Sequence, residues 1–133
     1  MPETFRVEIV SADRLVWEGE ATQLTAMTTE GEVGILAHHI PLIATLGAGT
    51  AEVTASDGSR QVIAVDGGFV SVGLDLTAII SPYAQMAMDI NIDEARRVML
   101  DLQAARDAGD NSMATRGAYK RAQAQIKAVE ARR

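Results

Sequence analysis

Apolar and polar residues alternate along most of the N-terminal part of the chain. In residues 5–9, Phe5-Arg6-Val7-Glu8-Ile9, every second side chain is apolar and the side chains between them are charged. A period of two is typical of a β-strand with one buried face. Similar short segments follow up to about residue 83, separated by turn residues and without a helical pattern between them. This arrangement predicts an antiparallel β-sandwich or barrel.

Two hairpins are predicted, one between residues 51–55 and 61–65 and one between residues 69–72 and 76–80. The first is connected by Ser56-Asp57-Gly58-Ser59, in which the Asp-Gly pair tolerates the positive φ angles of a tight turn. The adjacent glycines Gly67 and Gly68 come directly before the second hairpin. Paired glycines at a strand boundary predict a bulge or a close approach of two backbones.

After Pro82 the apolar residues recur every three or four positions, which predicts two helices. The first covers residues 92–108, with Asn91 or Asp93 to cap its start, Gly109 to end it, and an apolar stripe of Ala95, Val98, Met99 and Leu102. The second follows a cap at Asn111-Ser112 and carries the stripe Ala118, Ala122, Ile126 and Val129. Because only a few residues join the helices, we expect them to lie antiparallel.

Composition is consistent with a folded chain in two parts. The 133 residues are 47% hydrophobic and 23% charged, enough for one core and an appendage. We predict an α+β fold, with an antiparallel β-sandwich or barrel over residues 1–85 and an antiparallel two-helix hairpin over residues 90–133. No apolar run reaches the roughly 18 to 20 residues of a membrane-spanning helix, and the N-terminus does not resemble a signal peptide. We therefore expect any membrane contact to go through another protein.

Charge is divided unequally between the two parts. Residues 1–89 contain 3 Lys and Arg against 12 Asp and Glu, a net charge of −9, and residues 90–133 contain 9 against 6, a net charge of +3. Their sum is the net charge of the chain, −6. An acidic sandwich argues against nucleic acid as a partner, since phosphate contacts need a positive surface. The lack of cysteine excludes a disulfide framework and a thiol nucleophile.

The stretch from Glu30 to Leu42 combines acids, glycines, a proline and both histidines of the chain, and we expect it to form a shaped loop. A metal site would need His38 and His39 to converge on one ion. Adjacent side chains of an extended segment point to opposite faces, so we expect no metal site here. A small metalloenzyme built on the two histidines is kept as a rival hypothesis. No serine lies in a nucleophile-elbow context, and we expect no catalytic residues.

Four features that occur in the same order along the chain resemble the epsilon subunit of bacterial F-type ATP synthases. They are Val10-Ser11-Ala12-Asp13, the Glu30 to Leu42 stretch with His39-Ile40-Pro41-Leu42 at its end, the Gly67-Gly68 step, and Ile92-Asp93-Glu94-Ala95-Arg96. The resemblance covers nearly the whole chain, and its combination of motifs is more specific than any one of them.

The resemblance implies a non-catalytic central-stalk subunit, peripheral to the cytoplasmic face of the bacterial plasma membrane. In that family the sandwich contacts the gamma subunit and the ring of c subunits, and passes torque between the ring and the catalytic head. The helical hairpin either folds against the sandwich or extends toward the alpha and beta subunits, where it restrains ATP hydrolysis. Carried over to this sequence, the resemblance places Glu30, Glu32 and His39 at the interface with the c-ring.

The start of the first predicted helix also resembles the motif with which some bacterial epsilon subunits bind ATP. Ile92, Asp93 and Arg96 match that motif, whereas Arg97 replaces an alanine. A cap and a surface ion pair between Asp93 and Arg97 would account for the same residues without a ligand.

Further along, Arg121 matches one arginine of the family's ATP site, but Gln103 and Gln125 stand where nucleotide-binding members have two others. A triphosphate bound at a surface needs several converging cations, and their loss weakens the case for ATP. An ATP-sensing module is the alternative function that the sequence leaves open.

Overall fold

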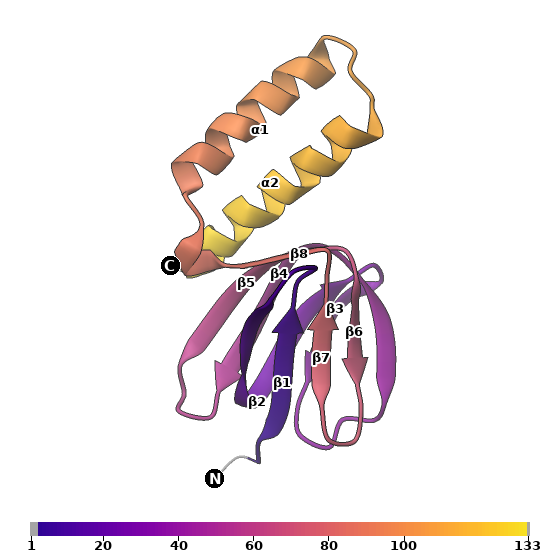
Figure 1. Ribbon diagram of the computed structural model, residues 1–133, viewed down its shortest axis with the longest axis vertical. Helices are drawn as coiled ribbons and strands as arrows, with labels where there is room; N and C mark the ends of the chain where they lie inside the picture. The colour runs from indigo at the N-terminus through magenta and orange to yellow at the C-terminus, as the bar shows by residue number, and fades with distance from the viewer. Residues whose placement is uncertain (1–2, 133) are drawn as a thin grey trace.

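Within residues 3–132, which the computed structural model describes, the chain forms eight strands and two helices (Figure 1). The strands are β1 (Phe5–Val10), β2 (Leu15–Thr28), β3 (Gly31–Ile35), β4 (Leu42–Ala55), β5 (Arg60–Asp66), β6 (Phe69–Val72), β7 (Thr77–Ile80) and β8 (Tyr83–Met86). A short 3₁₀ helix, η1 (Ala87–Asp89), leads to α1 (Ile92–Asp107) and α2 (Met113–Arg132). The predicted α+β fold is confirmed.

The two longest strands, β2 and β4, close the sheet into a sandwich. The described strands follow the order β3-β2-β1-β7-β6-β4-β5-β8, and β2 also pairs with β4. β2 pairs with β1 along its first half and with β4 from Ala21 to Thr28, so it passes from one layer to the other. β1 and β7 lie parallel. The alternation of residues does not reveal this parallel pair, because a period of two is the same for both strand directions.

The interior of the sandwich is aliphatic. Among its largest fully buried side chains are Ile9, Leu24, Ile35, Ile63 and Ile79, each from a different strand. The chain has only two Phe, one Trp and two Tyr residues. Branched aliphatic side chains therefore fill the core, and these fit well on pleated strands.

Both predicted hairpins are confirmed. β4 and β5 pair antiparallel through a turn in which Gly58 has a φ of 87°. β6 and β7 pair antiparallel as well. Between the hairpins, Gly67 and Gly68 adopt φ angles of 80° and 84°. A Cβ atom added to Gly68 would lie 2.7 Å from the Cα of Ser81 and would also overlap the carbonyl of Ile80, so the predicted close approach of two backbones is present.

Local signals at the helix ends act as predicted. The Asn91 side chain accepts a hydrogen bond from the backbone N–H of Glu94 at 3.1 Å and caps α1. Gly109 follows α1 with a φ of 102°. The Ser112 hydroxyl accepts a hydrogen bond from the backbone N–H of Thr115 at 3.2 Å, directly before α2.

Two details of the helices differ from the predictions. Arg97 pairs with Glu94 at 3.7 Å and with Asp101 at 3.5 Å, and not with Asp93, although all three carboxylates lie about one helical turn from it. Ala118, predicted to be part of the apolar stripe of the second helix, is exposed. It borders a cavity at this level of the hairpin instead of packing against α1.

Helix α2 joins the hairpin to the sandwich. It packs against β5, β4 and η1 on one side, while α1 packs against α2 (Figure 1). The buried contact is small and consists of Val62, Ala64, Ala87 and Ala128, bordered by Tyr83, Ile90 and Ala131. Strand β5 is thus covered on both faces, by the core on one side and by α2 on the other.

Replacing Gly68 by alanine should destabilise the sandwich strongly. The added methyl group meets backbone atoms that cannot rotate away, and φ is positive, so we expect a loss of at least about 3 kcal/mol in the free energy of unfolding, measured by urea denaturation. Gly67→Ala is the matched control, since φ is also positive but no atom lies within 4 Å of the new Cβ. It should cost only about 1 to 2 kcal/mol. Equal losses for both variants would contradict this explanation.

Candidate functional site

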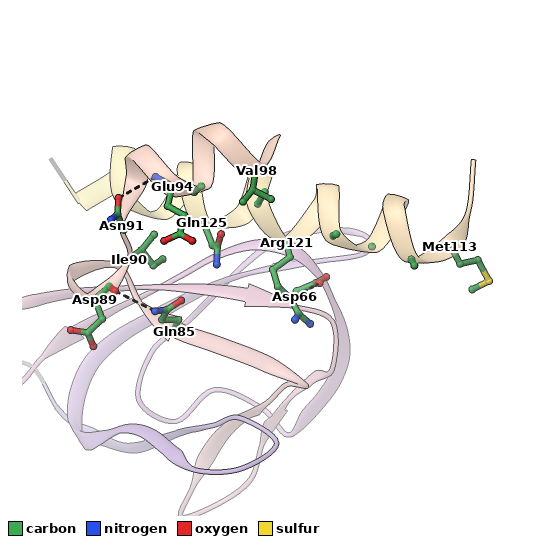
Figure 2. A pocket seen from close by; sticks show the side chains of 15 residues that line it. Asp66, Gln85, Asp89, Ile90, Asn91, Glu94, Val98, Met113, Arg121 and Gln125 are labelled. Carbon is green, nitrogen blue, oxygen red and sulfur yellow. Dashed lines mark hydrogen bonds and ion pairs between the residues drawn. The ribbon is translucent and has the colours of Figure 1, made fainter. Parts of the chain in front are cut away.

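A cavity of about 740 Å³ lies between the helical hairpin and the sandwich (Figure 2). Small residues of α2 form one wall, α1 forms a second, and the ends of β5 and β8 lie below them. The lining residues are Asp66, Gln85, Asp89, Ile90, Asn91, Glu94, Ala95, Val98, Met113, Ala114, Gly117, Ala118, Arg121, Ala122 and Gln125. Its volume exceeds that of the hollow beside His39, which is about 280 Å³.

The cavity carries more negative than positive charge. Asp66, Asp89 and Glu94 line it, against the single cation Arg121. Carboxylates at this density repel a phosphate chain. In the arrangement that the structure shows, the lining favours neutral or cationic groups over a nucleotide.

Arg121 is already engaged by the sandwich. Its Nε lies 3.6 Å from Oδ2 of Asp66, and its guanidinium carbon lies 4.6 Å from the centroid of the Tyr83 ring. Asp66 and Tyr83 are direct partners in the pairing of β5 with β8, so they present their side chains on the same face of the sheet. One helical cation is therefore held by a carboxylate and an aromatic face together.

The Tyr83 hydroxyl connects the sandwich to α2 a second time. It donates a hydrogen bond to Oε1 of Gln85 at 2.5 Å and accepts one from Nε2 of Gln125 at 2.8 Å. Burial raises the pKa of Tyr83 above its ordinary value, which keeps the phenol protonated and able to donate. We refer to Asp66, Tyr83, Arg121 and Gln125 as the clasp.

The structure does not gather the four residues of the predicted ATP site around this cavity. Ile92, Asp93 and Arg96 occupy the first turns of α1, and none of them lines the cavity. Asp93 and Arg96 are exposed, and Ile92 is half-buried. Only Arg121 lines the cavity, where Asp66 and Tyr83 hold it. ATP binding stays a prediction from the sequence.

The predicted interface residues lie at two ends of a strand. The stretch from Glu30 to Leu42 is not a single loop, because Gly31–Ile35 forms β3 and pairs with β2. Glu30 and Glu32 are exposed at the start of β3, whereas His39 is half-buried beyond its end. The His39 ring nitrogen Nδ1 lies 2.7 Å from the carbonyl oxygen of Ile40.

Comparison with known proteins agrees with this fold. The family model described as ATP synthase, Delta/Epsilon chain, beta-sandwich domain matches residues 4–87. The ATP synthase epsilon chain of Streptomyces avermitilis is 37% identical over 132 residues, which are 99% of this chain and 100% of the relative. The ATP synthase epsilon chain of Rhodococcus erythropolis is 39% identical over 125 residues, 93% of this chain and 94% of the relative.

The chain belongs to the epsilon-chain family of ATP synthases. It is accordingly an accessory subunit of that complex and not a catalytic one. Its fold is also similar to that of a chain in the cryo-EM structure of the Euglena gracilis mitochondrial ATP synthase (OSCP/F1/c-ring), with a TM-score of 0.76 and 20% identity, over 98% of this chain and 79% of that one.

Two further questions from the sequence concern a metal site at the histidines and a membrane-spanning helix. Among residues 3–132, no group of three or more histidine and acidic side chains is arranged to hold a metal ion. His38 instead pairs with Glu3 and has a φ of 67°, which is uncommon for a residue other than glycine. Neither described helix combines the length and apolar character needed to cross a membrane.

Sequence reasoning missed the face of α2 that docks on the sandwich. Two signals point to it in retrospect. The run Val62-Ile63-Ala64-Val65 is apolar without interruption, which indicates a strand covered on both faces. Residues of α2 spaced by three and four positions form a second stripe beside the predicted one, namely Arg121, Ala124, Gln125, Ala128 and Ala131.

Alkaline pH should loosen the contact through Tyr83. Because the folded chain raises the pKa of this phenol above 10.0, the protonated form contributes stability that is complete below about pH 10 and is lost as the pH rises through the raised pKa. We expect Tyr83→Phe to reduce the loss of stability between about pH 9 and pH 11, followed by thermal unfolding. Tyr119→Phe is the control. If both variants flatten the profile equally, Tyr83 is not the group responsible.

Proposed function

We propose that the chain works as a central-stalk subunit that couples rotation of the c-ring to the catalytic head through the gamma subunit. The observation that carries this proposal is an uncovered apolar face on the sandwich. Ile43 on β4, Phe69 on β6 and Ile80 on β7 all point outward, and Ile43 is 74% exposed. Large apolar side chains on neighbouring strands are typical of a surface that binds another protein.

The pairing of the strands places these three residues on one surface. Phe69 lies directly opposite both Ile80 on β7 and Thr45 on β4, and Ile43 lies two positions from Thr45 on the same face. Val70 and Ile79, the neighbours of Phe69 and Ile80 in the chain, point inward and are fully buried. The strands are therefore apolar on both faces, which a sandwich needs only where a partner covers the outer one. We propose that this partner is the gamma subunit.

A second apolar surface supports a contact with the c-ring. Leu36 and Ile40 follow β3, Leu74 lies in the turn between β6 and β7, and all three are exposed, Leu74 to 94%. Together with His39 they surround a shallow hollow of about 280 Å³. A membrane-embedded ring would bring the chain to the cytoplasmic face of the bacterial membrane without inserting it. Glu30, directly before β3, and Glu32, within it, lie toward the other end of that strand, and we propose that they belong to the c-ring interface as well.

The charge of the hairpin supports a contact with the catalytic head. Arg116, Lys120 and Lys127 are exposed on α2, and residues 90–133 carry a net charge of +3. An extended hairpin would present these cations to acidic surfaces of the alpha and beta subunits, where it would restrain ATP hydrolysis.

Introducing a charge on the apolar face tests the contact with the gamma subunit. Phe69 is exposed in the isolated chain. Phe69→Glu should weaken binding of the full chain to the gamma subunit roughly 100-fold, since the proposed interface would lose an aromatic contact and would have to bury a charge. Binding is measured by calorimetry with the purified subunits. Leu100→Glu, at an exposed apolar position on α1, is the control and should bind normally. Normal binding by Phe69→Glu would place the gamma subunit elsewhere.

Removing residues 90–133 tests the restraint on hydrolysis. Inverted membrane vesicles that contain the truncated chain should hydrolyse ATP several-fold faster than vesicles with the full chain, since the cationic helices no longer reach the head. Binding of the truncated chain to the gamma subunit and its circular dichroism spectrum show whether the sandwich is intact. Unchanged hydrolysis with an intact sandwich would exclude the inhibitory role.

A further inference from the structure

We infer that the clasp, Asp66, Tyr83, Arg121 and Gln125, holds the hairpin on the sandwich without any ligand, and that its opening is the step that releases the hairpin. This inference rests on the proposed function only in assuming that the hairpin leaves the sandwich. It assigns the docked state to contacts within the chain and not to a bound nucleotide.

The apolar contact alone is too small to hold α2 firmly. The buried residues of α2 are all alanines, Ala122, Ala124 and Ala128, and Ala128 forms a cluster with Val62 and Ala64 of β5 and Ala87 of η1. Alanine side chains bury little apolar area, and the hydrophobic gain scales with that area. Helix α1 packs against α2 and adds little direct contact with the sandwich. Polar contacts therefore decide how long α2 stays docked.

The clasp supplies these contacts at the middle of α2. Arg121 reaches Asp66 at 3.6 Å and stacks over Tyr83 at 4.6 Å, and Gln125, one turn further, donates to the Tyr83 hydroxyl at 2.8 Å. The three contacts depend on one another, because Asp66 and Tyr83 are neighbours across two strands and Arg121 and Gln125 are neighbours on one helix face. Breaking one loosens the geometry of the other two.

The end of α2 is tied down separately. An Arg60 guanidinium nitrogen donates a hydrogen bond to the carbonyl oxygen of Ala131 at 2.7 Å, and the same side chain pairs with Glu52. A cation at the C-terminus of a helix satisfies a free carbonyl group and complements the helix dipole. Arg60 therefore binds the C-terminal end of α2. The clasp binds the middle of α2, beside the cavity that separates α1 from the sandwich.

The strength of the clasp suits a reversible contact. The Arg121 side chain is 47% exposed and that of Asp66 is 21% exposed, so water screens their attraction, and an isolated pair of this kind contributes little. Stacking on a half-buried ring and a hydrogen bond to it add to the pair. The sum is enough to favour docking and small enough for a partner with stronger contacts to reverse it.

Spin labels on the isolated full chain test the clasp. The chain has no cysteine, so Ser59→Cys in the β4–β5 turn and Asn111→Cys between the helices provide two labelling sites, and pulsed electron paramagnetic resonance gives the distribution of distances between them. In the otherwise unchanged chain, most molecules should show one narrow distance, on the order of the 30 Å length of α2, because Ser59 lies near the end of α2 that Arg60 holds and Asn111 lies at the other end. Arg121→Gln should raise the undocked fraction roughly tenfold. Lys120→Gln, which removes the same charge from an exposed neighbour, should leave the distribution unchanged.

Two further variants show whether the contacts act together. Tyr83→Phe keeps the ring under Arg121 but loses the bond to Gln125, and should raise the undocked fraction less than Arg121→Gln. Asp66→Asn combined with Arg121→Gln should give less than the product of the two single effects, because the second change removes a contact already lost. Trp17, on β2, reports by its fluorescence that the sandwich is folded in every variant.

Three results would overturn the inference. They are a broad distance distribution in the unchanged chain, equal effects of Arg121→Gln and Lys120→Gln, and multiplicative effects of Asp66→Asn and Arg121→Gln. None of these measurements involves the rest of the synthase. If the hairpin undocks in the clasp variants but its truncation leaves hydrolysis unchanged, the inference about the clasp is supported and the inhibitory role of the hairpin is excluded.

Discussion

Strand β5 is the element on which the arrangement of the two parts depends. Its inward residues, Ile63 and Val65, belong to the core of the sandwich, and its outward residues, Val62 and Ala64, lie under α2. A strand covered on both faces cannot lose one cover without exposing apolar surface to water. The small size of Val62 and Ala64 limits that penalty. The same strand therefore contributes to the core of the sandwich and keeps the hairpin only moderately attached.

The polar contacts around β5 follow from its pairing with β8. Register places Asp66 opposite Tyr83, so a carboxylate and an aromatic ring face α2 side by side. The acidic sandwich and the basic hairpin meet at this point, where Arg121 is the cation of α2 that pairs across the contact in the described chain. Most of the remaining positive charge of the hairpin faces solvent. Docking therefore uses little of the charge that an extended hairpin would present to a partner.

The outward faces of β4, β6 and β7 differ from the outward face of β5, because no described helix covers them. Ile43, Phe69 and Ile80 are large and apolar, yet no element of the described chain covers them. In an isolated protein such a surface promotes aggregation, and in a subunit of a complex it is an interface. Membership of the epsilon-chain family makes the second explanation consistent with the rest of the molecule.

Local residue patterns determined much of this protein. The alternation of residues, the Asp57-Gly58 turn and the caps at Asn91 and Ser112 set the strands and helices, because each depends on neighbours in the chain. The family motifs are also short local stretches of sequence, and their order along the chain indicated the family. Tertiary structure alone decided that β1 lies parallel to β7, that Ala118 borders a cavity, and that Arg121 binds Asp66 and Tyr83 and lies apart from the other ATP-motif residues. These outcomes depend on strand register and helix docking, which bring together residues distant in the chain and leave no periodic signal in it.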